Sequence, residues 1–206
     1  MLWVNGFAER HGALTWSAVE TSSTENSVAL SAPDGATAVL EPFRFDAGGE
    51  LDAVSLPVAL DGLVSWVTPP TRLALILVRR GGYAVGLGQG TKLVAHKVGT
   101  RYVQSRTAAG GWSQHRFARR RDNQADALVG SVIEHTLRVV MASPSDALVV
   151  GGDKALVRDV LGDARLARLA DLPRRELFDM PDPKLVVLER ALRRARAVRI
   201  WLVDPH

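Results

Sequence analysis

The residues that most suggest chemistry are a glycine pair followed closely by a glutamine, in the run Gly110-Gly111-Trp112-Ser113-Gln114. Glycine accepts positive φ and allows the backbone to come close to a ligand. A glutamine amide has an acceptor oxygen and two donor hydrogens, so it can orient a water molecule and hold a developing oxyanion. This combination suits hydrolysis of an activated bond such as an ester. The alternative is a glycine-rich hairpin tip with an incidental glutamine.

Two neighbours of Gln114 each have two interpretations. His115 can act as a general base or simply contact phosphate and solvent. Trp112 can stack on a nucleobase, an interaction worth about 1–3 kcal/mol, or it can cap the core beneath the loop. The sequence leaves both questions open.

The charges are strongly segregated along the chain. Residues 62–121 contain eleven lysines and arginines and no carboxylate, whereas residues 1–61 contain nine carboxylates and two arginines. A basic segment attracts polyanions, and arginine matches phosphate geometry with two parallel hydrogen bonds. The alternative is that the acidic N-terminal third folds against the basic segment and neutralises it. The residues predicted to bind nucleic acid are Lys97, Arg101, Arg106, Trp112, Arg116, Arg119, Arg120 and Arg121.

The elements around the glycine loop determine where Gln114 lies. Short apolar runs at 73–78, 83–87, 93–96 and 101–105 are separated by glycine turns, which predicts an antiparallel meander of strands. Apolar residues then recur at intervals of three and four, which predicts a helix over 117–141. The loop would therefore lead into a helix N-terminus, where unpaired N–H groups and the helix dipole favour an anion.

The rest of the pattern predicts a mixed α/β fold, in which the meander is followed by helix-strand-helix units packed on the sheet. We expect a helix over 2–12, a hairpin around Asp34-Gly35, and a turn at Gly86–Gly90. Later elements are expected at 147–150 and 198–203 (strands) and at 153–161 and 185–195 (helices). We expect a single domain over 1–206, with an acidic subregion at 1–65 and a catalytic core at 70–206.

Several classes of protein are excluded or disfavoured. The chain has no cysteine, which excludes disulfides, thiolate metal sites and a cysteine nucleophile. The histidines have no metal-ligand spacing, so we expect no metal and no cofactor. No apolar run approaches the ~20 residues of a membrane span, and the N-terminus does not resemble a signal peptide. We therefore expect a cytoplasmic monomer that does not bind membranes.

Three motifs together resemble a known family. Arg101-Tyr102, the run Gly110–Gln114 and the run Arg119-Arg120-Arg121-Asp122-Asn123-Gln124 are similar to the bacterial branch of the Vms-like release factors. That branch consists of peptidyl-tRNA hydrolases related to the middle domain of eukaryotic and archaeal release factors. The resemblance covers residues 70–141. The release factors' Gly-Gly-Gln is interrupted here by Trp112 and Ser113.

The resemblance implies hydrolysis of the bond between nascent peptide and tRNA on stalled or split large ribosomal subunits. Gln114 would be the catalytic residue, in a loop completed by Gly110, Gly111 and Ser113. The partners would be peptidyl-tRNA and the ribosomal RNA of the large subunit. Two alternatives remain open: a metal-free endonuclease that cuts tRNA near its 3′ end, and a ribosome- or RNA-binding module without activity.

Overall fold

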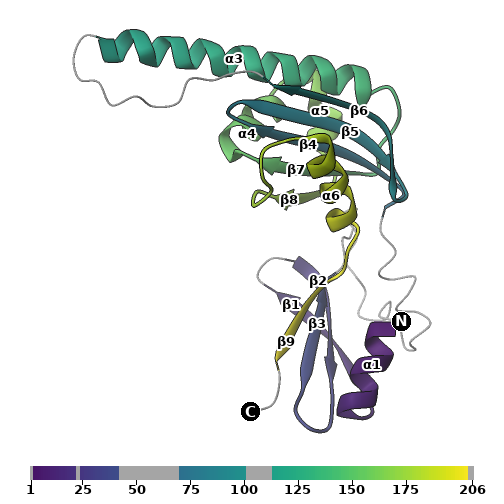
Figure 1. The fold of residues 1–206 in the computed structure, drawn as a ribbon. Coiled ribbons are helices and arrows are strands. Elements are labelled where there is room, and N and C mark those ends of the chain that lie inside the picture. The colour runs from purple at the N-terminus through teal and green to yellow at the C-terminus, as the bar shows by residue number, and fades with distance from the viewer. Residues whose placement is uncertain (1, 22–23, 42–69, 101–112, 204–206) are drawn as a thin grey trace. The chain divides into compact units, whose positions relative to one another are not determined.

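The computed structural model describes residues 2–21, 24–41, 70–100 and 113–203, with side chains described at all of these except 18–26 and 113–123. The chain divides into two compact units (Figure 1). One is drawn from Met1–Pro69 together with Arg196–His206, and the other is Pro70–Ala195. The predicted strand at 101–105 lies outside the described residues.

The first unit is a four-stranded antiparallel sheet with a helix packed on it. Helix α1 (Leu2–His11) precedes strands β1 (Thr15–Thr21), β2 (Thr24–Ser31) and β3 (Thr37–Glu41), and the sheet order is β1-β2-β3-β9. The predicted hairpin around Asp34-Gly35 is confirmed: β2 pairs with β3, and Gly35 has φ 93°. Phe7 of α1 is buried with Leu30 and Leu40 in the core of this unit.

The last strand of the chain, β9 (Arg199–Val203), pairs with β3. Glu41 is buried at this junction. Its carboxylate accepts hydrogen bonds from Arg199 at 3.1 Å and from the Trp201 indole at 3.3 Å. The expected core of 70–206 includes this strand, but in the structure β9 belongs to the N-terminal sheet. Burial of Glu41 beside a guanidinium from the far end of the chain is a pairing that no local pattern reveals.

The second unit is a mixed five-stranded sheet, which confirms the predicted fold class. The strands are β4 (Arg72–Arg79), β5 (Gly82–Gln89), β6 (Lys92–Thr100), β7 (Ala147–Gly152) and β8 (Arg174–Leu177). The order is β6-β5-β4-β7-β8, with antiparallel pairing along β4-β5-β6 and parallel pairing along β4-β7-β8. The predicted meander therefore forms one half of the sheet.

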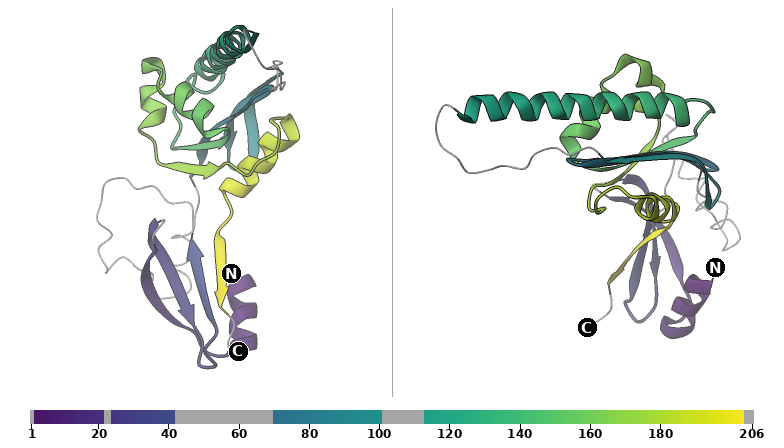
Figure 2. Two further views of the ribbon diagram at one scale, coloured as in Figure 1. Left: turned by 90° about the vertical axis from the view of Figure 1, so that its left-hand side faces the viewer. Right: turned by 45° about the horizontal axis from the view of Figure 1, so that its top comes forward.

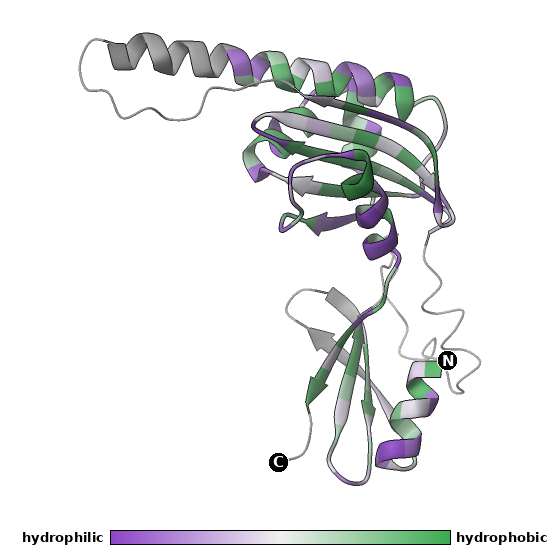
Figure 3. Cartoon of the chain, in the orientation of Figure 1, coloured by the Kyte–Doolittle hydropathy of each residue, from purple (hydrophilic) through white to green (hydrophobic). Residues whose placement is uncertain are grey.

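Helices cover both faces of this sheet (Figure 2). On one face lie α3 (Ser113–Val139), α4 (Lys154–Leu161), the 3-10 turn η2 (Ala164–Leu166) and α5 (Ala167–Ala170), and on the other lies α6 (Leu185–Ala195). Both hydrophobic and hydrophilic residues occur along the second half of α3 and along α6, as Figure 3 shows. The bounds of α6 are those predicted for the helix over 185–195.

The glycines of β5 show where the sequence interpretation was wrong. The run Gly86–Gly90 was expected to be a turn, but Gly86 and Gly88 lie inside the strand. A Cβ atom on Gly86 would lie 2.9 Å from Leu188 of α6, and one on Gly88 would lie 2.5 Å from Leu192. These glycines therefore let α6 approach the sheet closely, and only Gly90, with φ 57°, belongs to the turn.

An aromatic contact joins α3 to the sheet. The Tyr83 ring of β5 stacks on His135 of α3 with 5.6 Å between ring centroids. The same ring fills the space over Gly99 of β6, where a Cβ atom would lie 2.4 Å from it. The pKa of His135 is lowered, chiefly because burial disfavours the charged ring, and further by the nearby cations Arg138 and Lys97.

We predict that Gly152→Ala destabilises the protein strongly. Gly152 ends β7 with φ 99°, and a Cβ atom there would lie 2.1 Å from the carbonyl oxygen of Val78. Steric overlap and a disfavoured φ should together cost about 2 kcal/mol or more. Urea denaturation measures the change. Gly130→Ala is the matched control, because a Cβ atom in that helical position meets nothing within 4 Å and should be neutral or stabilising. Equal stability of both variants would contradict the prediction.

We also predict that His135 makes stability depend on pH. Its folded-state pKa lies below the ordinary value of 6.5, so near that pH the unfolded chain binds more protons than the folded protein. The free energy of unfolding should therefore fall as the pH drops below about 6.5. His135→Phe should reduce this fall, measured by urea denaturation at pH 7 and pH 5. The exposed His96 provides the control variant, His96→Gln, which should retain it. An unchanged pH dependence in His135→Phe would contradict the assignment.

Candidate functional site at the start of helix α3

The predicted catalytic glutamine lies in the first turn of α3. Ser113 is the first residue of the helix and Gln114 the second. The predicted helix over 117–141 thus begins four residues earlier than expected, because neither glycine nor proline interrupts the chain between Ser113 and Gly130. Gly110, Gly111, Trp112, Arg101 and Arg106 lie outside the described residues.

The sequence of this helix start is entirely free of negative charge. The first turn of α3 contains no acidic residue, and the first carboxylate along the helix belongs to Asp122. N–H groups of a helix's first turn lack partners within the helix, and the dipole makes this end positive. With no carboxylate to compensate, the start of α3 is suited to an anion or a developing oxyanion.

Four of the predicted phosphate-binding arginines follow within the next two turns. Arg119 and Arg120 come three and four residues after Arg116, so these three positions share one face of the helix. Arg121 is seven residues after Gln114, so it shares the face of the glutamine. The four arginine positions therefore lie on two sides of the helix start rather than along one stripe.

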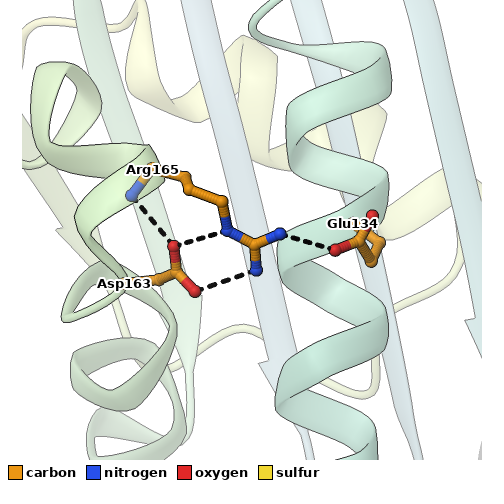
Figure 4. A network of polar contacts seen from close by, with 3 residues as sticks. All are labelled: Glu134, Asp163 and Arg165. Carbon is orange, nitrogen blue, oxygen red and sulfur yellow. Dashed lines mark hydrogen bonds and ion pairs between the residues drawn. The ribbon is translucent and has the colours of Figure 1, made fainter.

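The second half of α3 fixes the helix on the sheet. Leu128, Val132 and Ile133 are buried against the core of this unit. A second attachment, shown in Figure 4, comes from Arg165 of η2. Its guanidinium donates hydrogen bonds to Glu134 of α3 at 2.8 Å and to Asp163 at 2.9 and 3.0 Å, and we call this set of ion pairs the Arg165 clamp. The hydrogen bonds from Arg165 lower the pKa of the Asp163 carboxyl. The apolar contacts supply most of the attachment, because exposed ion pairs contribute little.

Lys97 lies far from the glutamine. It stands opposite Val85 in the register of β5 and β6 and is exposed, close enough to His135 to affect the pKa of that ring. Gln114 and His135 are 21 residues apart along α3, which corresponds to about 30 Å at the helical rise of ~1.5 Å per residue. Lys97 therefore belongs to a distal part of the surface, on the side of His135.

The sequence predicted neither a metal site nor a membrane-spanning helix. In the described part of the chain, no group of three or more His, Asp or Glu side chains is arranged to hold a metal ion. None of the helices in those ranges is both long and apolar enough to cross a membrane.

Comparison with solved structures shows the fold. The structure titled "Vms1 mitochondrial localization core" aligns with a TM-score of 0.50 at 11% identity, covering 87% of this chain and 77% of that one. A structure titled "Archaeal protein" aligns over 80% of this chain and 52% of that one, at 17% identity and a TM-score of 0.26. No curated protein sequence matches this one.

Comparison with family models identifies the family. The model acVLRF1, described as the actinobacteria/chloroflexi VLRF1 release factor, matches residues 71–201. This range runs from the first strand of the mixed sheet through α3 and α6 into β9, and so includes the glycine loop, Gln114 and the arginine-rich helix start. The chain therefore belongs to the VLRF1 release-factor family of actinobacteria and chloroflexi.

Proposed function

We propose that this protein hydrolyses the ester bond between a nascent peptide and tRNA on stalled or split large ribosomal subunits. The observation that carries the proposal is the position of Gln114, three residues after a glycine pair and in the first turn of a helix that begins without a carboxylate. Membership of a release-factor family supports a role in peptide release.

In the proposed mechanism, the Gln114 amide orients a water molecule toward the ester carbonyl carbon. The water oxygen bonds to that carbon, and the carbonyl oxygen becomes negatively charged. The N–H groups at the start of α3 and the amide of Gln114 are suited to stabilise this oxyanion. The oxyanion then re-forms the carbonyl double bond as the bond from the carbon to the tRNA 3′ oxygen breaks. The proton that the attacking water loses passes to this 3′ oxygen, which gives free tRNA and the peptide acid. Gly110, Gly111 and Ser113 would shape the loop that brings the backbone close to the ester.

The arginines are proposed to hold the substrate. Arg116, Arg119, Arg120 and Arg121 follow the glutamine closely on α3 and would bind tRNA or ribosomal RNA phosphates. Arg101, Arg106 and Trp112 would contribute from the preceding segment, and Lys97 from farther along the surface. The protein would act in the cytoplasm as a monomer, without metal or cofactor.

We predict that Gln114→Ala abolishes peptide release but preserves the fold, because this exchange leaves the α3 backbone and its apolar anchor unchanged. The rate of release from stalled ribosome–nascent-chain complexes should fall by about 10²–10³-fold, as when one oxyanion donor is removed. A gel that retains peptidyl-tRNA separates substrate from products. Gln89→Ala is the matched control, because Gln89 is exposed at the end of β5 and should release peptide at the wild-type rate.

The same gel distinguishes the two alternatives. Intact tRNA as product supports ester hydrolysis, whereas tRNA shortened at its 3′ end would identify an endonuclease. Absence of release from whole ribosomes, split large subunits and free peptidyl-tRNA would leave a binding module. Full release by Gln114→Ala would refute the catalytic assignment.

We further predict that replacing Arg119, Arg120 and Arg121 with glutamine weakens binding to tRNA. Loss of three phosphate contacts should reduce the slope of log affinity against log salt concentration by about 2–3. Filter binding at several salt concentrations measures this slope. The control replaces three arginines outside α3, namely Arg168, Arg190 and Arg193, which are exposed on α5 and α6. Equal slopes for the two triple variants would show that binding follows net charge alone.

A further inference from the structure

A pocket of about 500 Å³ lies between α4 and β8, outside the site described above. None of its lining residues belongs to α3 or to the segment before it. Its volume falls within the range of roughly 300–1,000 Å³ typical of small-molecule sites. The pocket is therefore large enough for one nucleotide.

The charged residues of this pocket come from one face of α4 and one side of β8. Lys154 and Arg158 are four residues apart on α4, so they share the face of the helix that lines it. Arg174 and Glu176 alternate along β8 and therefore point to the same side of that strand. Asp153 fixes the start of α4 by accepting hydrogen bonds from the backbone N–H groups of Ala155 at 2.9 Å and Leu156 at 3.3 Å.

The rim of the pocket is basic. The lining contains three positively charged residues, Lys154, Arg158 and Arg174, and one carboxylate, that of Glu176. Neither Lys154 nor Arg174 forms an ion pair with another residue that the structure describes. Among the described residues, the guanidinium of Arg158 forms an ion pair with its neighbour Asp159, at 3.3 Å and on the exposed surface, where such a pair is weak. The three cations can thus be redirected to an anionic ligand at little cost.

The floor of the pocket is apolar. Val157 and Leu161 are buried, and Phe178 completes the lining from the segment after β8. The ammonium group of Lys154 lies 4.9 Å from the centroid of the Phe178 ring. A positively charged rim beside an aliphatic and aromatic floor suits a ligand with an anionic group and a flat, largely apolar part.

We propose that this pocket binds a phosphate-bearing nucleotide, either free or as one unit of single-stranded RNA. The three cations would bind the phosphate, and the floor would contact the sugar and base. The preference for a nucleotide over other organic phosphates rests on the proposed function, since a protein acting on peptidyl-tRNA meets RNA. The pocket would then be an RNA contact separate from the catalytic loop.

Titration of the isotope-labelled protein with adenosine 5′-monophosphate, monitored through backbone amide NMR signals, tests this proposal. The signals of α4 and β8 should shift. Arg158→Gln combined with Arg174→Gln should weaken binding by about tenfold or more, since hydrogen bonds to charged groups are lost. Both side chains are exposed, so the variant should fold, and circular dichroism checks this. The matched control is Arg190→Gln combined with Arg193→Gln on α6. Equal affinities in the two double variants would overturn the proposal.

Further titrations test the apolar floor and the source of the ligand. Inorganic phosphate should bind at least tenfold more weakly than adenosine 5′-monophosphate, and Phe178→Leu should weaken only the nucleotide. Equal affinity for inorganic phosphate would overturn the assignment to a nucleotide. A single-stranded pentaadenylate that shifts the same signals with higher affinity identifies RNA as the source, and tighter binding of the mononucleotide identifies a free nucleotide.

The two proposals can fail independently. Gln114→Ala should bind adenosine 5′-monophosphate as the wild type does. If the wild type releases no peptide but the pocket binds the nucleotide and loses it in the double variant, the proposed function fails and the pocket stands. If peptide is released and no signal of α4 or β8 shifts, the pocket proposal fails and the proposed function stands.

Discussion

The central strand β4 is buried on both faces, and the rest of the second unit depends on that burial. Leu73 through Val78 are at most 1% exposed. Their side chains alternate, so each face of the strand demands its own cover of apolar residues. One face receives α3 and α4, the other receives α6, and β7 pairs alongside in parallel. Together these elements exclude water from both faces of the strand.

Glycine supplies the space that this packing needs. At Gly86 and Gly88 the missing side chains admit Leu188 and Leu192 of α6, and at Gly99 the missing side chain admits the Tyr83 ring. The ring in turn meets His135 on α3. The helix that carries Gln114 in its first turn is therefore held at its second half by contacts that depend on small residues in the sheet. The first half carries the arginines.

Charge and attachment are divided between the two ends of α3. The apolar residues from Leu128 onward and the Arg165 clamp hold the C-terminal half. The N-terminal turns carry four arginines and, in the first turn, no acid. An arginine cluster of this kind is costly to bury and is suited to contact phosphate. The helix thus connects the apolar core of the second unit to a segment in which positively charged residues are concentrated.

Local patterns in the sequence determined most of the second unit. Short apolar runs between glycines predicted β4, β5 and β6, and spacings of three and four predicted α3, because a helix that buries one face must repeat in this way. The same local patterns identified the glycine loop, Gln114 and the arginines beside them as candidates. Placing Gln114 in the first helical turn required the structure, since helix ends depend on capping and competing turns rather than on periodicity.

Contacts between distant segments were decided only by the tertiary structure. The pairing of β9 with β3 brings Arg199 to Glu41. The sequence around either residue contains no pattern that predicts this ion pair. The closely spaced glycines Gly86 and Gly88 are typical of a turn. Local sequence does not show which side chains of a distant helix will pack against a glycine, so their place in a strand was not predicted. The sequence did not predict the pocket between α4 and β8, because residues 122–206 carry no net charge. Folding brings Lys154, Arg158 and Arg174 together around one cavity. The sequence by itself determined most of the helices and strands and indicated the glycine-rich segment before Gln114 as a candidate site, because these follow from local patterns. It did not predict β1 or β8. The tertiary structure decided which distant side chains meet, because those contacts depend on how apolar faces pack together.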